Sequence, residues 1–123
     1  MLVIEGIVIG GNRLGRKLGF PTANIALTED SLVENGVYAS RVYLESGESY
    51  SAMTNVGVRP SVDGTKRLLE THLFGFDGSL YDLKLRVELL EKIRDEKKFD
   101  SVDELRDQIA KDSKRVKELI ANI

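Results

Sequence analysis

Apolar and polar residues alternate along most of residues 1–100, a pattern typical of β-strands that bury one face. The segments that read as strands are Leu2–Ile9, Val37–Leu44, Ser49–Val56, Arg67–Phe76 and Leu80–Ile93. Short turn-forming sequences join them, and Gly57–Thr65 is predicted to be a loop with Arg59 near its base. Because no helical pattern lies between the strands, the sequence predicts an antiparallel sheet that closes on itself.

The hydrophobic period changes to that of a helix after residue 100. Ser101 and Glu104 have the spacing of a capping box, which marks a helix N-terminus. One apolar stripe at helical spacing follows, formed by Val102, Leu105, Ile109, Val116, Leu119 and Ile123. The predicted fold is therefore mainly β: residues 1–100 form a single closed antiparallel, Greek-key barrel of about six strands, and residues 101–123 form a C-terminal α-helix packed on it.

Composition narrows the class of protein. The 123 residues correspond to one domain, and the absence of cysteine excludes disulfides and thiolate metal sites. The 18 basic and 20 acidic residues give a net charge of -2, so we expect no broad nucleic-acid surface. No apolar run reaches the roughly 20 residues of a membrane span, and nothing resembles a signal peptide, so a cytoplasmic protein without membrane contact is expected.

The stretch Gly15–Asn24, GRKLGFPTAN, carries the most chemistry. Pro21 fixes its own φ and disfavours a helix, so this is predicted to be a shaped loop. Thr22 and Asn24 lie two residues apart, so on an extended backbone their side chains point the same way. Hydroxyl and amide oxygens suit a hard cation such as Mg²⁺. The alternative is a Pro-Thr turn followed by a strand, in which Asn24 satisfies its own backbone.

A glycine-rich run precedes this loop. Gly10 and Gly15 have the spacing of a Walker A sequence, but Arg16 and Lys17 replace its Lys-Ser/Thr pair, so a P-loop NTPase is rejected. Glycine amides can still cradle phosphates outside that fold, and Arg16 can add a fork of donors. The alternative is a hairpin turn that needs positive φ.

Glu70 is the candidate base. In its strand, Glu70, His72 and Phe74 share one face, either an outer wall or the lining of a cavity. Solvent exposure is the ordinary interpretation of a mid-strand glutamate, and burial would favour a role as a base. His72 is the only histidine and is given no role.

The run Gly6–Asn24 resembles the signature of the riboflavin kinase family, in particular the C-terminal kinase module of bacterial bifunctional riboflavin kinase/FAD synthetases. The resemblance spans nearly the whole chain in the right order. It continues through Gly36–Ala39, Asn55–Pro60, Glu70–His72, Leu80–Tyr81 and Arg94–Phe99.

This resemblance implies transfer of the γ-phosphoryl of ATP to the terminal ribityl hydroxyl of riboflavin, which gives FMN and ADP, with Mg²⁺ or another divalent cation as cofactor. Glu70 matches the family's general base, and Arg94 and Phe99 match its flavin-binding loop. Alternatively, Phe99 packs beneath the helix and Arg94 pairs with Glu96 or Asp95. The matching nucleotide contacts are Gly10, Gly15, Arg16, Thr22 and Asn24, of which Thr22 and Asn24 also match the metal ligands.

Two departures from the family pattern stand out. Asp82 follows Tyr81 where the family commonly has glycine, and aspartate tolerates a positive φ better than most residues. Family members are usually fused to an FMN adenylyltransferase half, which nothing before Met1 supplies, so FAD synthesis is not expected of this chain.

The competing hypothesis is a small β-barrel that binds flavin, nucleic acid or a protein partner without catalysis. Few aromatic residues and the net acidity argue against nucleic acid. The basic residues that could form a patch are Arg13, Arg16, Lys17, Arg59, Lys66 and Arg67.

Overall fold

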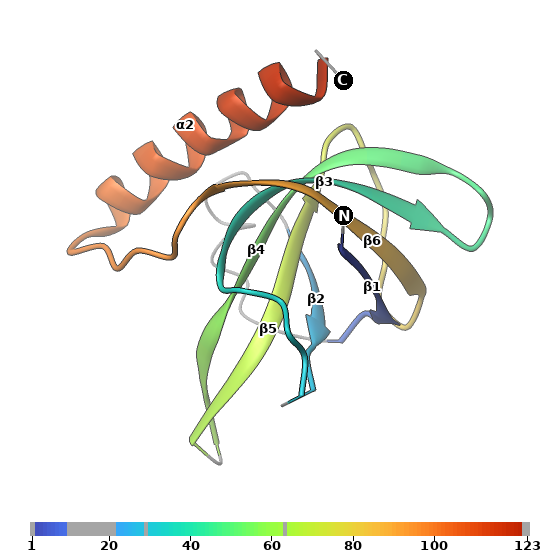
Figure 1. The fold of residues 1–123 in the computed structure, drawn as a ribbon, viewed down its shortest axis with the longest axis horizontal. Helices are drawn as coiled ribbons and strands as arrows, with labels where there is room; N and C mark the ends of the chain where they lie inside the picture. Colours follow the sequence, from blue (N-terminus) through green and yellow to red (C-terminus); the bar gives the residue numbers. More distant parts are fainter. Residues whose placement is uncertain (1, 10–21, 29, 63, 122–123) are drawn as a thin grey trace.

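The computed structural model describes residues 2–9, 22–28, 30–62 and 64–121. Within these ranges lie six strands and one helix (Figure 1). They are β1 (Leu2–Ile7), β2 (Ala23–Ala26), β3 (Gly36–Leu44), β4 (Ser49–Ser61), β5 (Gly64–Leu73), β6 (Lys84–Arg94) and α2 (Val102–Ala121). The predicted mainly β fold with one C-terminal helix is confirmed.

The strands form one antiparallel sheet in the order β1-β6-β3-β4-β5-β2. β3, β4 and β5 follow one another as hairpins, and β6 returns to pair with β3, which is the Greek-key arrangement. The sheet curls until its two outermost strands approach each other. Its seam is joined at an isolated bridge, where the amide of Ile9 donates to the carbonyl of Asn24 at 2.8 Å. The barrel is therefore nearly closed.

The hairpin of β4 and β5 is longer than the sequence predicts. Gly57 to Ser61 continue β4 and pair with Leu68 to Gly64 of β5, so the predicted loop over residues 57–65 is wrong. Beyond Val56 the described residues of β4 pair with β5 and no longer with β3, so this part of the strand is an edge, where a proline without an N–H is tolerated. In Figure 1 this hairpin extends well beyond the rest of the barrel.

Two strand ends also differ from expectation. β5 ends at Leu73, so Phe74 lies in the following turn, and β6 begins at Lys84. Residues 80–83 form a turn in which Asp82 has a φ of 66°. Aspartate in the left-handed region agrees with the positive φ predicted at this departure from the family pattern.

Alternation along β5 separates the barrel core from its outer wall. Leu69, Thr71 and Leu73 are buried inside, so Glu70 faces outward. A line of buried hydroxyls crosses the interior, because Ser40 Oγ lies 2.6 Å from Thr54 Oγ1, which lies 2.9 Å from Thr71 Oγ1. This line satisfies polar groups that would otherwise be costly to bury.

Helix α2 lies across the outer wall of the barrel and contacts β3, β4 and β6 (Figure 1). Val116 is fully buried against Val37, Ala39 and Met53, which form a second apolar cluster outside the barrel. The helix begins as predicted, since Ser101 Oγ accepts from the amide of Glu104 at 3.1 Å. The Glu104 carboxylate reaches back to the amide of Asp100 instead of that of Ser101.

Candidate active site

Three polar side chains lie side by side on the outer wall of the barrel. Asn24 of β2 is directly opposite Glu70 of β5, which is directly opposite Asn55 of β4. Their neighbours along the strands face the core, so all three point outward. We call these residues the polar row. Adjacent strands are about 4.8 Å apart, so the row places an amide on each side of a carboxylate at that spacing.

The polar row contains two amide oxygens without a donor among the described residues. Asn24 Oδ1 and Asn55 Oδ1 are both buried, and neither accepts a hydrogen bond from that part of the chain. Asn24 is 4% exposed, so this oxygen is withdrawn from solvent. A buried acceptor without a donor is costly, and such groups are often kept for binding or catalysis.

The carboxylate of Glu70 is held by an arginine from the long hairpin. Arg59 Nε donates to Glu70 Oε1 at 2.6 Å, and Arg59 Nη1 donates to Glu96 Oε1 at 2.7 Å. The Glu70 side chain is only 16% exposed. We call Glu70, Arg59 and Glu96 the Arg59 cluster. It joins the candidate base to the segment between β6 and α2.

Gly57 makes room for this cluster. Asn55, Gly57 and Arg59 alternate on the same face of β4, so the glycine lies between the amide of the polar row and the arginine. A Cβ built on Gly57 would overlap the carboxylate of Glu96. The bare backbone at this position therefore lets Glu96 reach the arginine across the strand.

The pKa of the Arg59 guanidinium is raised above its ordinary value. Burial is the largest single influence and lowers it, but the charges of Glu70 and Glu96 and their hydrogen bonds together outweigh burial. Arg59 therefore stays charged at every pH at which the protein is folded, and it is a fixed positive charge beside Glu70.

Arg94 lies on β6, two strands beyond Asn55 in the same row of paired residues across the sheet. Val37 of β3 pairs with Asn55 on one side and with Arg94 of β6 on the other. The guanidinium of Arg94 contacts α2, where it donates to Asp112 from Nε at 3.0 and 3.1 Å and from Nη2 at 2.8 Å. Glu96 or Asp95 was the alternative partner for Arg94 in place of a flavin; in the described structure the carbonyl of Asp95 accepts from Arg94 Nη1 at 2.9 Å.

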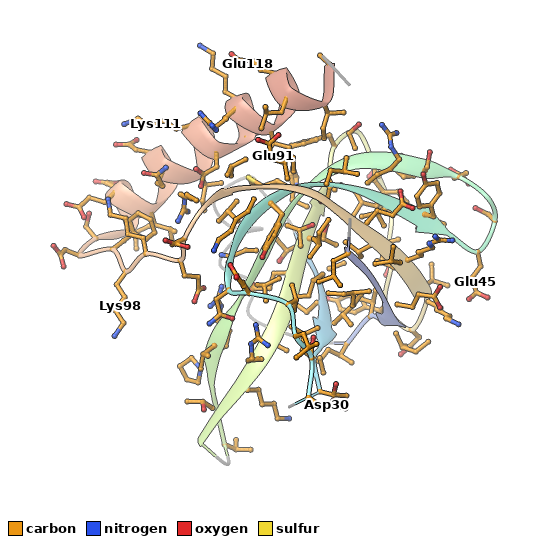
Figure 2. All side chains as sticks on the ribbon, viewed as in Figure 1. Asp30, Glu45, Glu91, Lys98, Lys111 and Glu118 are labelled. Atoms are coloured by element: carbon orange, nitrogen blue, oxygen red, sulfur yellow. The ribbon has the colours of Figure 1, made fainter. Side chains whose placement is uncertain are left out.

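Phe99 lies in the segment between β6 and α2. Its ring has Arg94 Cζ at 5.8 Å and Lys97 Nζ at 5.6 Å from its centroid, within reach of cation–π attraction. Lys98 projects away from the barrel in the same segment (Figure 2). Arg94 and Phe99, the two predicted flavin contacts, are therefore brought together, and Arg94 also anchors the helix.

The predicted phosphate contacts Gly10, Gly15 and Arg16 lie outside the described residues. Thr22 immediately precedes β2 and is partly buried, two residues from Asn24. Among the described residues no group of three acidic, histidine or cysteine side chains could hold a metal ion. Asn24 Oδ1 is a neutral oxygen that accepts no hydrogen bond from the described residues, and an oxygen of this kind fits a hard cation.

Sequence reasoning missed three residues that contact or flank Glu70. Asn55 was noted within a run shared with the family, Arg59 as a loop residue and a member of a basic patch, and Glu96 as an alternative partner for Arg94; none was connected with Glu70. The alternation of residues 55, 57 and 59 could have placed them on one face, had residues 57–65 been recognised as strand. The pairing of Arg59 with Glu70 depends on the register of the hairpin, which sequence spacing does not supply.

Two residues of the basic patch in the competing hypothesis are engaged by partners within the protein. Arg59 is paired with two glutamates, and Arg67 donates to Asn35 Oδ1 and to the carbonyl of Val33. Neither guanidinium is arranged for a phosphate backbone. In the part of the chain that the structure describes, no helix is long and apolar enough to span a membrane.

The comparisons with known proteins agree on one family. A family model described as riboflavin kinase (flavokinase) matches residues 1–120. The bifunctional riboflavin kinase/FMN adenylyltransferase of Haemophilus influenzae is 48% identical over 114 residues, which are 93% of this chain and 37% of that protein. The chain thus spans little more than a third of the length of this curated relative.

Solved structures agree with the fold. The crystal structure of riboflavin kinase from Trypanosoma brucei matches with a TM-score of 0.64 and 25% identity, covering 97% of this chain and 79% of that one. A Streptococcus pneumoniae structure described as a macrolide-efflux protein matches with a TM-score of 0.82 and 37% identity. That match covers 94% of this chain and 38% of the other.

Proposed function

Because the chain belongs to the riboflavin kinase family, we propose that this domain transfers the γ-phosphoryl of ATP to the terminal hydroxyl of the ribityl chain of riboflavin. The products are FMN and ADP. The observation that carries the proposal is the polar row, in which Glu70 lies between two amide oxygens that lack donors.

Glu70 acts as the general base in this proposal. It accepts the proton of the ribityl hydroxyl while the hydroxyl oxygen bonds to the γ-phosphorus and the bond to the ADP oxygen breaks. Its outward direction makes it reachable by a substrate on the barrel wall, and its partial burial limits competition from water. Arg59 fixes the position of the carboxylate.

Asn24 and Thr22 hold the nucleotide side of the site. When bound, a divalent cation would neutralise charge on the transferring phosphoryl group. The Asn24 amide oxygen is well suited to hold this cation, because it is buried and accepts no hydrogen bond from the residues that the structure describes. In phosphoryl transfer most of the catalysis is positioning and charge stabilisation, which a fixed row of this kind supplies.

The polar row indicates from which side of Glu70 each substrate approaches. Asn24 on β2 and Thr22 just before it lie at one side of Glu70, whereas Asn55, Arg94 and Phe99 lie towards the other side. ATP therefore approaches from β2 and riboflavin from β4, with the flavin ring near the segment between β6 and α2. Asn55 Oδ1 is placed to accept a hydrogen bond from a hydroxyl of the ribityl chain.

The test is FMN formation by the wild-type domain and by Glu70→Gln with riboflavin, ATP and MgCl₂, the flavins being separated by chromatography. We expect wild-type FMN to depend on both ATP and metal, and Glu70→Gln to lose about 10²-fold or more in kcat. Riboflavin affinity should change little, because the substitution keeps the shape of the side chain.

Glu88→Gln is the matched control. Glu88 is also an outward-facing strand glutamate with an arginine partner, and its side chain is 14% exposed against 16% for Glu70. It should retain wild-type activity. A folded wild-type domain that forms no FMN under several metals and pH values would overturn the proposal in favour of a binding module.

A further inference from the structure

A carboxylate interrupts the apolar face that α2 turns towards the barrel. Ile109, Asp112 and Val116 follow one another at helical spacing, and the two apolar residues pack in the cluster outside the barrel. Asp112 lies between them and is 4% exposed. A leucine at this position would continue the apolar stripe, and apolar replacements of buried ion pairs are often as stable as the pairs themselves. Packing of the helix therefore does not require the charge of Asp112.

We propose that Asp112 is a positioning residue for the flavin. It holds the guanidinium of Arg94 beside the ring of Phe99, and these two flat groups form the surface on which the ring system of riboflavin rests. This inference rests on the proposed function, and it extends the flavin site from the segment between β6 and α2 to the helix itself. Asp112 acts through Arg94 and does not touch the flavin.

Hydrogen bonds from three nitrogens fix the plane of the Arg94 guanidinium. Nε donates to both carboxylate oxygens of Asp112 at 3.0 and 3.1 Å, Nη2 donates to Oδ2 at 2.8 Å, and Nη1 donates to the carbonyl of Asp95 at 2.9 Å. The carboxylate is itself held from within the helix, because Gln108 Nε2 donates to Asp112 Oδ1 at 2.9 Å. The guanidinium is therefore oriented before a ligand arrives, and preorganisation of this kind increases affinity.

This pairing suits the chemistry of the proposed ligand. The ring system of riboflavin is flat and uncharged, so it gains from stacking on flat groups and not from a free positive charge. Arginine stacks on aromatic faces while its edge is hydrogen-bonded, and Arg94 Cζ lies 5.8 Å from the centroid of the Phe99 ring. Lys97 Nζ lies 5.6 Å from the same centroid, but that side chain is exposed, so a flat ligand can take its place. Asp112 thus gives Arg94 its counter-charge from the side of the helix and leaves the face of the guanidinium for the flavin.

Other carboxylates of the neighbouring segment have partners of their own. Glu96 is engaged on β4, and the Asp95 carboxylate lies 2.6 Å from Lys92 Nζ. In the part of the chain that the structure describes, Asp112 is thus the carboxylate in contact with the Arg94 guanidinium. The Asp112 side chain is 6% exposed against 20% for that of Arg94. The acid therefore lies deeper than the arginine, which stays within reach of a ligand.

The test is the affinity for riboflavin, measured in the presence of MgADP by the quenching of flavin fluorescence on binding, together with the KM values for riboflavin and ATP. Asp112→Asn keeps the size of the side chain, but it removes the charge and one acceptor of the fork. We expect riboflavin affinity to fall and the KM for riboflavin to rise about tenfold, which corresponds to the loss of one charge-assisted hydrogen bond. The KM for ATP should stay within about twofold, because Asn24 and Thr22 lie on the other side of Glu70.

Val116→Ala is the control that separates this role from a loss of stability. Val116 is fully buried one turn after Asp112, so its truncation should lower the urea midpoint of unfolding without removing a contact of Arg94. Its riboflavin affinity should remain that of the wild type. If Val116→Ala weakened riboflavin binding as much as Asp112→Asn, the docking of the helix would explain both losses, and the inference would be overturned.

A double-mutant cycle tests whether Asp112 acts through Arg94. Arg94→Lys keeps a positive charge beside Asp112 but lacks the flat face and the fork, so it should lose about tenfold or more in riboflavin affinity. The double variant Arg94→Lys/Asp112→Asn should bind riboflavin no more weakly than Arg94→Lys alone, because the oriented guanidinium is already lost. Losses that add, or an Asp112→Asn variant with wild-type riboflavin affinity, would overturn this inference alone. Absence of FMN with the wild type would overturn the proposed function instead, and the binding measurement would still decide this inference.

Discussion

Replacing Arg94 with methionine removes the cation that holds α2 against the end of β6. Arg94 and Asp112 form a forked pair with donor–acceptor distances of 2.8 to 3.1 Å, and Gln108 Nε2 adds a donor to Asp112 Oδ1 at 2.9 Å. Asp112 is 4% exposed. The substitution therefore leaves a carboxylate beneath the helix, with Gln108 as the donor that remains among the described residues.

The expected loss in the free energy of unfolding follows from the burial of the ion pair. Removing one partner of a fully buried ion pair costs about 3–5 kcal/mol. The Arg94 side chain is 20% exposed and Gln108 stays bonded, so we expect a loss of about 2–3 kcal/mol in the free energy of unfolding. At the roughly 2.1 cal/mol/K per residue typical of domains, 123 residues lose about 4 °C in Tm for each kcal/mol, so Tm should fall by about 8–12 °C.

The assay is urea unfolding followed by far-ultraviolet circular dichroism, which reports α2, and by tyrosine fluorescence, since the chain has no tryptophan. Arg106→Met is the matched control. It removes an arginine from a pair with Asp103 on the exposed face of α2, where the arginine side chain is 54% exposed and the atoms are 3.4 Å apart. Its cost should stay below about 0.5 kcal/mol.

A cost for Arg94→Met no larger than that of Arg106→Met would refute the assignment of Arg94 as the anchor of α2. The double variant Arg94→Met/Asp112→Leu gives a further check, because it removes the stranded carboxylate and should recover much of the lost stability. A role confined to flavin contact would instead weaken riboflavin binding while unfolding stayed at the wild-type midpoint.

Two further predictions concern the segment between β6 and α2. Gly57→Ala should displace the Glu96 carboxylate from its place on β4 and so loosen Arg59, which holds Glu70. The value of kcat for FMN formation should fall with far-ultraviolet circular dichroism unchanged, and a wild-type kcat would contradict this prediction. The hydrogen bond from Lys92, 2.6 Å from Asp95, and then its charge lower the pKa of Asp95. The stability from this pair is full above the unfolded value of about 3.9 and lost as pH falls through the lower folded value. Lys92→Met should therefore raise the Asp95 titration midpoint measured by NMR towards about 3.9, and an unchanged midpoint would exclude the pairing.

Sequence pattern predicted the helix and every described strand except β2, because each of these elements carries its own evidence. β2 (Ala23–Ala26) agrees with the alternative of a Pro-Thr turn followed by a strand, and the predicted shaped loop through Asn24 is wrong for Ala23 and Asn24. Leu83 to Leu89 alternate with charged residues, and three of the four apolar positions prove to be buried; Leu83, which precedes β6, is exposed. The capping sequence Ser101–Glu104 likewise contains the start of α2. Such signals are local, so a window of a few residues is enough to detect them.

The hairpin of β4 and β5 shows where local signals fail. Gly57, Pro60 and Gly64 are all turn formers, and together they predict a loop. Pairing with Gly64 to Leu68 overrides that preference and extends the strand to Ser61. The error matters for function, because it is the extended strand that places Arg59 on the same face as Asn55.

The site differs from the fold in how its parts are encoded. Resemblance to a family gave Glu70 a role without giving its neighbours, and spacing along the chain could not, because Glu96 follows Arg59 by 37 positions. Their contact depends on a strand register, on a glycine that leaves space, and on the path of the segment leading to α2. Arg94 fixes that path from the other side by holding Asp112. The two arginines therefore act on one segment: Arg94 sets where it begins against the helix, and Arg59 draws its glutamate to the base. This links the anchoring of α2 to the contact between Glu96 and Arg59, so Arg94→Met should also lower kcat for FMN formation; a wild-type kcat in the folded variant would contradict this link.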